Sequence, residues 1–526
     1  MLKPPCSTPA VHSSISVTCT APVPTADVVQ AIPLGGHGDS LSRRPLLPPE
    51  INATDRPQTI CITGALGYIG SRVTSRLLSR GHRIHIVDLP RALESEWTKK
   101  FVQDPSISDR VKLFPCDLMQ AKTSPDGSPS PDLARLHDAV RGCDSVIHLV
   151  AMVNVTPRKA DQQRMYDLGM EGTRNILSVV SSLSAPSSSS PASSSSSSPR
   201  RVVMLSSVAA CVADNWERGK EHTFSAADFS QTCSLKSFTY SFVKRESELL
   251  ARRLSADQAY KLVTVCPGVT FGPISNSIHS KTSPGMLLAL LLAREGFRIF
   301  GFHVSLRFLI PELHTLFSDV DDVAAVISAA TVATDTDLNG QDRFIVGSAL
   351  TSLTHMSEHL EEIVRADATH GTADATADGI APSDKVTAAS REQNVLQEEK
   401  RTTDYLYQVP MGLDNGSPIY PHSASLPSSS QRPPLPPPPP GIFPRLSKWV
   451  AQDLAPKLLG CERLMPSIAM DLALLPLTCG RPIRGLDMNP TVASLGLQRS
   501  VPWCATLKDT ARSMQDLELI KGWKMT

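Results

Sequence analysis

The chain has 526 residues and a formal net charge of +1, from 52 basic and 51 acidic side chains. This balance gives no electrostatic reason to expect binding to nucleic acid. The 43 prolines and many of the serines cluster outside the segments with helix or strand periodicity, in residues 1–56, 181–200 and 366–440. Such segments bury too little apolar area to offset the entropy of folding, so we predict that they are disordered.

Eleven cysteines occur without a C-x-x-C pair, which favours reduced core thiols over a disulfide framework or a zinc site. We predict no metal site. No segment contains the run of about 18 apolar residues that a membrane span needs, although the apolar stretch 286–310 leaves contact with a membrane surface open. We expect a cytoplasmic protein. Residues 1–26 lack acids and are rich in Ser and Thr, so an organelle or the surface of the endoplasmic reticulum is the alternative.

The turn TGALGYIG, residues 63–70, directly follows an apolar strand predicted at Thr59–Ile62 and opens an amphipathic helix. This order of strand, turn and helix forms a pyrophosphate site, because the N–H groups at the helix N-terminus face the anion. Gly64 allows the tight turn, Gly67 lets the backbone approach the phosphates, and Gly70 lets the helix pack on its strand. The alternative interpretation is a glycine turn that has no role in binding a ligand.

The next predicted strand, Ile84–Val87, ends in Asp88, 18 residues beyond Gly70. An acid at this distance accepts hydrogen bonds from the adenosine ribose and repels a 2′-phosphate, which favours NAD as the cofactor. Arg91 keeps NADP open as the less favoured alternative. The combination predicts a dinucleotide-binding domain.

Strands and helices alternate along the following chain, which predicts an α/β fold with a doubly wound parallel sheet of the Rossmann type. In chain order we expect a strand at 111–114, a helix at 132–141, a strand at 145–150, a helix at 161–180, a strand at 202–205, a helix from about 240 and a strand at 262–266. Ligands of such sheets bind beyond the carboxyl ends of the strands. The residues predicted at this edge, besides the glycine turn, are Asp88, Asp117, Leu118, Leu149, Val150, Ala151, Ser206, Ser207, Pro267 and Gly268.

Tyr240 and Lys244 are four residues apart on a predicted helix, so their side chains share one face. We expect the lysine ammonium to lower the pKa of the phenol from its usual value of about 10, so that Tyr240 exchanges a proton with a substrate hydroxyl or carbonyl. Lys244 can also bind the nicotinamide ribose, and a serine of the pair Ser206-Ser207 can hold the substrate oxygen. A chance Tyr-x-x-x-Lys match is the alternative, but its place at the edge of the glycine turn favours catalysis.

Two further groups of polar residues receive structural interpretations. His148 ends a buried strand and is predicted to be a core histidine rather than a base. Asp319, Asp321 and Asp322 stand at the start of a predicted helix, where they are expected to cap it rather than to bind a cation.

The motifs resemble those of the extended short-chain dehydrogenase/reductase family, within the NAD-dependent epimerase/dehydratase superfamily. The matching segments are TGALGYIG (63–70), CDL (116–118), HLVA (148–151), GTRNIL (172–177), LSS (205–207), YSFVK (240–244), PGVTFGP (267–273), FSDVDDVAAVISAA (317–330), FIVGS (344–348) and a C-terminal element at 495–514. The stretch 146–175 is most similar to the 3β-hydroxysteroid dehydrogenase branch. The dihydroflavonol-reductase-like and sugar-nucleotide epimerase branches share much of this pattern.

The resemblance implies a catalytic triad of Ser207, Tyr240 and Lys244, with Ser207 preferred over Ser206. Together with the glycine turn it implies a cofactor site that comprises Gly64, Gly67, Tyr68, Ile69, Gly70, Asp88, Asp117, Leu118, Leu149, Val150, Ala151, Tyr240, Lys244 and Pro267. Of these, Asp117 and Leu118 are implied to contact adenine. Two positions depart from the family pattern: Gly169 stands where members usually carry Asn, and Cys266 where they often carry Arg. The first departure puts the rate of the reaction in doubt.

We therefore predict an NAD-dependent oxidoreductase that acts on a secondary alcohol or its ketone, in a nucleotide-binding domain at 57–272 and a smaller substrate lobe at 273–365 and 441–526. A sterol-like or other bulky apolar substrate is expected, because the region after residue 273 is rich in Leu, Ile and Phe. Two other functions stay open, a sugar-nucleotide epimerase or dehydratase that keeps its cofactor bound, and a non-catalytic dinucleotide sensor or scaffold. Among partners besides the small-molecule substrate, a homodimer and a proline-recognition module bound to Pro433–Pro440 stay open.

Overall fold

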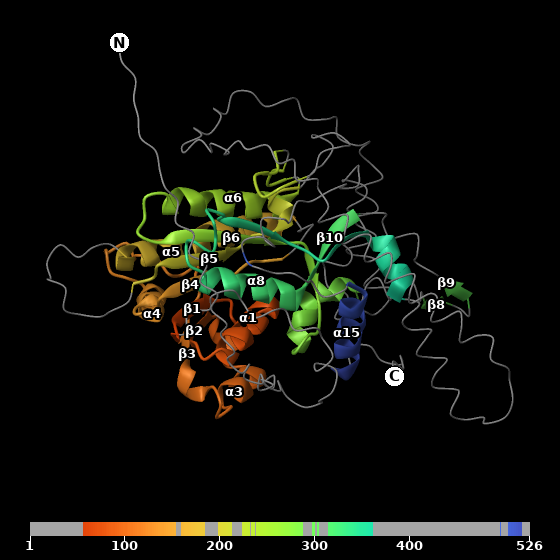
Figure 1. Ribbon diagram of the computed structural model, residues 1–526, viewed down its shortest axis with the longest axis horizontal. Helices are drawn as coiled ribbons and strands as arrows, with labels where there is room; N and C mark the ends of the chain where they lie inside the picture. Colours follow the sequence, from red (N-terminus) through yellow and green to blue (C-terminus); the bar gives the residue numbers. More distant parts are fainter. Residues whose placement is uncertain are drawn as a thin grey trace, which may run out of the picture.

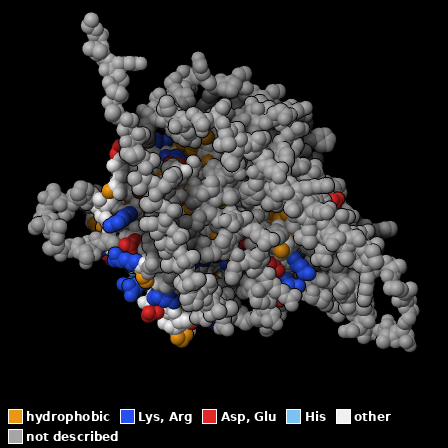
Figure 2. All heavy atoms as spheres, in the orientation of Figure 1, with side chains coloured by type: hydrophobic (Ala, Val, Ile, Leu, Met, Phe, Trp, Pro, Cys, Tyr) orange, Lys and Arg blue, Asp and Glu red, His pale blue; other side chains and the backbone are white. Residues whose placement is uncertain are grey.

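The computed structural model describes residues 56–153, 159–184, 198–212, 224–231, 233–236, 238–287, 297–299, 302–304, 314–360, 495 and 503–517. The predictions of disorder for 1–55, 185–197 and 366–440 fall outside the described residues. Where described atoms are visible in Figure 2, basic and acidic side chains lie next to one another, in keeping with the balanced charge. No described helix has the length and apolar character needed to cross a membrane.

A seven-stranded parallel sheet forms the centre of the structure (Figure 1). Its strands, in spatial order, are β11 (Arg343–Val346), β6 (Lys261–Pro267), β5 (Arg201–Leu205), β4 (Ser145–His148), β1 (Thr59–Thr63), β2 (Arg83–Asp88) and β3 (Val111–Pro115). The direction of strand order reverses between β1 and β4, so the ligand crevice of the fold lies at the carboxyl ends of these two strands. The predicted doubly wound sheet is confirmed.

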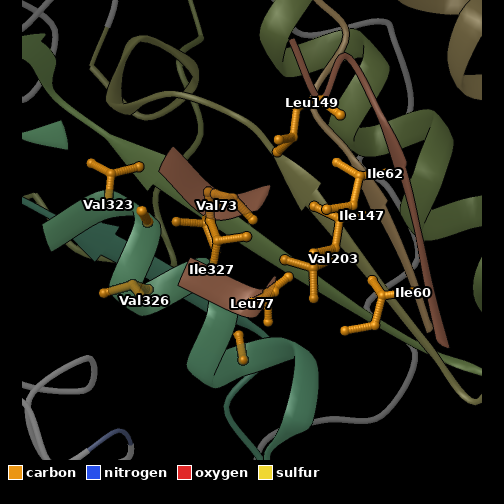
Figure 3. Close-up of a cluster of buried hydrophobic side chains, with 14 of the residues drawn as sticks. Ile60, Ile62, Val73, Leu77, Ile147, Leu149, Val203, Val323, Val326 and Ile327 are labelled. Carbon is orange, nitrogen blue, oxygen red and sulfur yellow. The ribbon is translucent and has the colours of Figure 1, made fainter. Parts of the chain in front are cut away.

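Helices cover both faces of this sheet. Successive side chains of each strand point to opposite faces, and because apolar side chains lie on both faces, each face is buried under helices. The helices are α1 (Tyr68–Ser79), α2 (Pro90–Leu93), α3 (Glu96–Val102), α4 (Pro131–Val140), α5 (Lys159–Ser184), α6 (Thr239–Ser255) and α8 (Val320–Val332). Ile62 of β1 belongs to the cluster on the face of α1 and α8, with Leu77 and Ile327 (Figure 3). Its neighbour Cys61 belongs to the cluster on the face of α4 and α5, with Leu136.

Two elements differ from their predicted bounds by more than one residue at an end. The strand expected at 145–150 ends at His148, and the helix expected at 161–180 extends to Ser184. The backbone therefore leaves the sheet directly after His148. Val150 and Ala151 line the pocket beside Tyr240, whereas the side chain of Leu149, predicted to line the cofactor, is buried in the core cluster with Ile62. The strand β11 lies in the stretch 273–365 assigned to the substrate lobe, yet it pairs with β6, with Ile345 opposite Cys266.

A smaller sheet contains β7 (Val269–Phe271), β10 (His314–Asp319) and β12 (Ala349–Ser352), and β8 (Phe297–Ile299) pairs with β9 (Phe302–Val304). The C-terminal helix α15 (Trp503–Asp516) packs on the smaller sheet (Figure 1). Thr510 Oγ1 of α15 accepts a hydrogen bond from Gly272 N–H at 2.8 Å, and Ser513 Oγ accepts one from Ile274 N–H at 3.0 Å. Helix α15, which is more than 200 residues away in the sequence, thus binds the backbone directly after β7.

The structure shows His148 in the core and Asp319 as a helix cap, as predicted, with Asp321 and Asp322 in the first turn of α8. Asp319 is the N-cap of α8 and accepts a hydrogen bond from Asp321 N–H at 2.7 Å. His148 is buried, its Nδ1 is hydrogen-bonded to Thr63 Oγ1 at 2.8 Å, and burial lowers its pKa to about 3. An imidazole with that pKa stays neutral at physiological pH.

Candidate active site

The glycine turn between β1 and α1 has little room for a Cβ at Gly64 and none at Gly70. A Cβ on Gly70 would lie 2.1 Å from Gly64 O, and a Cβ on Gly64 would lie 3.2 Å from Val150 N. Gly64 also has a φ of +74°, a region that glycine occupies without strain. The N-cap Gly67 makes no side-chain cap, and the first turn of a helix carries N–H groups that bind an anion. The turn therefore fits the pyrophosphate of a dinucleotide.

Asp88 lies against this turn at the end of β2. Its Oδ2 accepts a hydrogen bond from Leu66 N–H at 3.2 Å, and its Oδ1 accepts one from Leu89 N–H at 2.9 Å. Burial raises the pKa of Asp88, and the two backbone donors and Arg91 oppose that rise. The carboxylate thus connects the glycine turn to β2, at the position predicted for an acid that binds ribose.

Four of the predicted cofactor residues also have structural contacts of their own. Tyr68 Oη donates to Gly272 O at 3.0 Å, and Ile69 packs between two core clusters. Asp117 Oδ1 accepts from Met119 N–H at 3.0 Å, whereas Leu118 is buried in the core. The structure therefore places Asp117 after β3 as predicted, while the side chain of Leu118 points into the protein.

The three residues predicted to be catalytic lie together at the carboxyl ends of β4 and β5. The Ser207 side chain is hydrogen-bonded to that of Tyr240. Lys244 Nζ donates to Leu205 O at 3.0 Å. Val150, which contacts the glycine turn, lines the same pocket as Tyr240 and Lys244. Val150 thus lies between the glycine turn and the pair Tyr240 and Lys244.

The expectation that Lys244 lowers the pKa of Tyr240 is wrong for this structure. Burial raises the pKa of Tyr240, and only the hydrogen bond from Ser207 opposes this rise. Burial also lowers the pKa of Lys244 to about 8, against the attraction of the Glu248 carboxylate. The physical reason is that both side chains leave water, which disfavours the charged form of each. Tyr240 is therefore a protonated phenol at neutral pH.

The pocket beside Tyr240 and Lys244 lies between α5 and α6 and is mostly apolar. Three methionines, Met152, Met165 and Met204, contribute to its lining. Gly169 lies there as well, and a Cβ at this position would approach Val243 Cγ1 to 2.6 Å. The departure from the family pattern at Gly169 thus allows α5 and α6 to pack closely next to the predicted catalytic pair.

The sequence reasoning missed a buried network behind this cluster. Ser206 Oγ donates to Glu248 Oε2 at 2.6 Å, and Glu248 forms an ion pair with Arg343 at 2.7 Å. Glu248 follows Lys244 by four residues, so helical periodicity could have placed it on the same face. Arg343 lies 95 residues away on β11, and no local signal connects it with the site.

Among the described residues, no group of three or more His, Cys, Asp or Glu side chains is placed to hold a metal ion. None of the seven cysteines that the structure describes forms a disulfide with another described cysteine, and six of them are buried.

Comparison with known proteins adds a family and several relatives. The chain is 26% identical over 225 residues to cinnamoyl-CoA reductase 1 of Oryza sativa subsp. japonica, covering 42% of this chain and 56% of the relative. It is 24% identical over 236 residues to dihydroflavonol 4-reductase of Zea mays, covering 44% and 58%. The matches thus span a little over half the length of these curated relatives.

Among solved structures, yeast methylglyoxal/isovaleraldehyde reductase Gre2 complexed with NADPH has a TM-score of 0.49 at 14% identity, over 88% of this chain and 99% of that chain. The model of the NAD dependent epimerase/dehydratase family matches residues 60–347, which is more than half of the chain. This agrees with the resemblance to extended short-chain dehydrogenases/reductases. The chain belongs to the NAD dependent epimerase/dehydratase family.

Proposed function

We propose that the protein reduces the carbonyl group of a small apolar substrate, or oxidises the matching secondary alcohol. The observation that carries this proposal is the meeting of Ser207, Tyr240 and Lys244 after the carboxyl end of β5, with Val150 between the pair Tyr240 and Lys244 and the glycine turn. Bound NAD(P)H supplies the hydride. Tyr240 donates its phenolic proton to the substrate oxygen as that oxygen gains negative charge, and Ser207 holds the same oxygen by a hydrogen bond. Lys244 stabilises the phenolate that is left.

The raised pKa of Tyr240 supports carbonyl reduction as the main direction near neutral pH. A protonated phenol is an acid, which reduction needs, whereas oxidation needs the phenolate as a base. Lys244, with a pKa of about 8, carries its positive charge at pH 7 and favours the phenolate formed during the reaction. Reduction should therefore weaken as Lys244 loses its proton above pH 8.

For the cofactor, Asp88 supports NAD over NADP. Its half-buried carboxylate lies at the end of β2, against the glycine turn, where it repels a 2′-phosphate. The exposed Arg91 three residues later is the group that would favour NADP.

For the substrate, the cavity beside Tyr240 and Lys244 has a volume of about 20 Å³, which is room for about one water molecule, so the cavity itself does not select a substrate. The names of the relatives, cinnamoyl-CoA reductase and dihydroflavonol 4-reductase, point to aryl carbonyl compounds. A sterol-like substrate stays a prediction.

The test is a spectrophotometric screen of the full chain with NADH and NADPH against a dihydroflavonol, cinnamoyl-CoA, a 3-ketosteroid and UDP-glucose. Tyr240→Phe should lower turnover by about 10²- to 10⁴-fold, with an unchanged Kd for the dinucleotide. Tyr260→Phe is the matched control, because Tyr260 is a buried tyrosine that bonds Ser255 before β6. An unchanged rate in Tyr240→Phe would refute the catalytic role. Purification with tightly held NAD and turnover of UDP-glucose alone would support the epimerase alternative.

A further inference from the structure

Helix α6 carries three ionisable side chains at spacings of four residues, so Tyr240, Lys244 and Glu248 share one face. Each of them bonds a different member of the consecutive residues 205–207 at the end of β5. The three pairs are Lys244 Nζ with Leu205 O at 3.0 Å, Glu248 Oε2 with Ser206 Oγ at 2.6 Å, and Tyr240 with Ser207. The helix and the strand end are therefore held in one register by three adjacent contacts.

Glu248 is the buried carboxylate of this set, and both of its oxygens accept hydrogen bonds. None of its side chain is exposed, and it accepts hydrogen bonds from Arg343 Nε at 2.7 Å and Nη2 at 3.1 Å. Thr264 Oγ1 donates to the same carboxylate at 3.1 Å. Burial raises the pKa of Glu248, but Arg343 and Arg252 outweigh burial and hold it below its usual value. The ionised carboxylate cannot turn away from Ser206 without breaking a buried ion pair.

Arg343 in turn fixes the segment 224–230, which follows the predicted catalytic serine in the chain. Its Nη1 donates to Ala226 O at 2.8 Å and to Asp228 O at 2.5 Å, and its guanidinium lies 3.9 Å from the centre of the Phe229 ring. Ser230 N–H then donates to Ala210 O at 2.8 Å, in the short helix that begins after Ser207. Glu248 thus binds Ser206, before Ser207, and Arg343 binds the segment that contacts Ala210, after Ser207.

We propose that Glu248, paired with Arg343, is a positioning group that acts through the Ser206 hydroxyl to hold Ser207 against Tyr240. The first serine of the pair orders the second one, because adjacent residues of an extended strand move together. This inference rests on the proposed roles of Ser207 and Tyr240. It assigns Ser206 a positioning role and no contact with the substrate.

The test measures the pKa of Tyr240 in full-length protein without added dinucleotide. Ultraviolet absorbance of phenolate is followed during a pH titration, and the matching Tyr240→Phe variant is subtracted. In Ser206→Ala the pKa of Tyr240 should rise by about 0.5–1, the effect of losing one hydrogen bond from Ser207. Ser206→Thr, which keeps the hydroxyl, should titrate as the parent protein does. Ser145→Ala is the matched control, since Ser145 is a buried serine at the opposite end of a parallel strand.

A turnover measurement completes the test once a carbonyl substrate is found. Ser206→Ala should lower kcat by on the order of 10- to 100-fold, with KM for the dinucleotide unchanged, because it misplaces a catalytic group without touching the cofactor site. A Ser206→Ala protein in which Tyr240 titrates normally would overturn the inference, whatever the turnover. A shifted titration in a protein that reduces no carbonyl would leave the positioning role intact and refute the proposed function instead.

Discussion

Replacing Gly70 with alanine tests the dinucleotide site without the need for a substrate. The new Cβ would lie 2.1 Å from Gly64 O and 2.9 Å from the Ala65 carbonyl carbon, and real Cβ contacts essentially never fall below 3.0 Å. The glycine turn and the first turn of α1 must therefore separate by about 0.9 Å, because the clash is with backbone that cannot rotate away.

A displacement of this size is large compared with the tolerance of a hydrogen bond. Losing one N–H bond to a charged phosphate costs about 1.5–3 kcal/mol, and about 1.4 kcal/mol corresponds to a tenfold change in Kd. We therefore expect the Kd for NADH to rise at least about tenfold in Gly70→Ala. The free energy of unfolding should fall by about 1–3 kcal/mol from overpacking.

The assay is a titration of NADH fluorescence, with circular dichroism to verify that the variant is folded. Gly81→Ala is the matched control at the other end of α1: its φ is +84° and nothing lies within 4 Å of an added Cβ. This control should lose about 1–2 kcal/mol of stability from backbone strain and keep the parent Kd. If folded Gly70→Ala binds NADH within twofold of the parent, the glycine turn is not the phosphate site.

Three further changes have defined outcomes. Asp88→Asn removes the charge beside the glycine turn, so the ratio of kcat/KM for NADH to that for NADPH should fall by on the order of tenfold; an unchanged ratio would contradict the role of Asp88. Gly169→Asn should lower the free energy of unfolding in urea by about 1–3 kcal/mol, because its Cβ meets Val243 Cγ1 at 2.6 Å, and Val243→Ala in the same chain should restore most of the loss. His148 has a folded pKa of about 3 against about 6.5 when unfolded, so stability is complete above pH 6.5 and falls as the pH drops toward 3. At pH 5 this loss amounts to about 2 kcal/mol, and His148→Asn should flatten the urea midpoints between pH 7 and pH 5.

The parts of the site that sequence reasoning located share a local origin. A strand, a glycine turn and an acid after the next strand are defined by short spacings, and Tyr240 and Lys244 by a single helical turn. The strand order then brings these segments to one edge, as the rule for parallel sheets requires. For this reason the glycine turn, Asp88 and the Ser-Tyr-Lys cluster lie where they were predicted.

The parts that were missed depend on contacts between distant segments. Arg343 reaches Glu248 across 95 residues, and Thr510 reaches Gly272 across 238. Neither pair has a periodic signal, because each depends on the register in which separate elements pack. The predicted direction of the pKa shift of Tyr240 was wrong for a related reason. The sequence shows that a lysine is four residues away, but it does not show that both side chains are buried.

The contact between α15 and the residues after β7 can form only late in protein synthesis, because α15 is translated long after β7. Ribosomes add about 5–20 residues per second, so the 238 residues between Gly272 and Thr510 take roughly 12–48 s to translate. Until α15 is made, the nascent chain has no Trp503 to pack against Phe271 and, once β10 is made, against Phe317. The apolar side chains of the smaller sheet therefore reach their final packing only after the helix at 503–516 has been made.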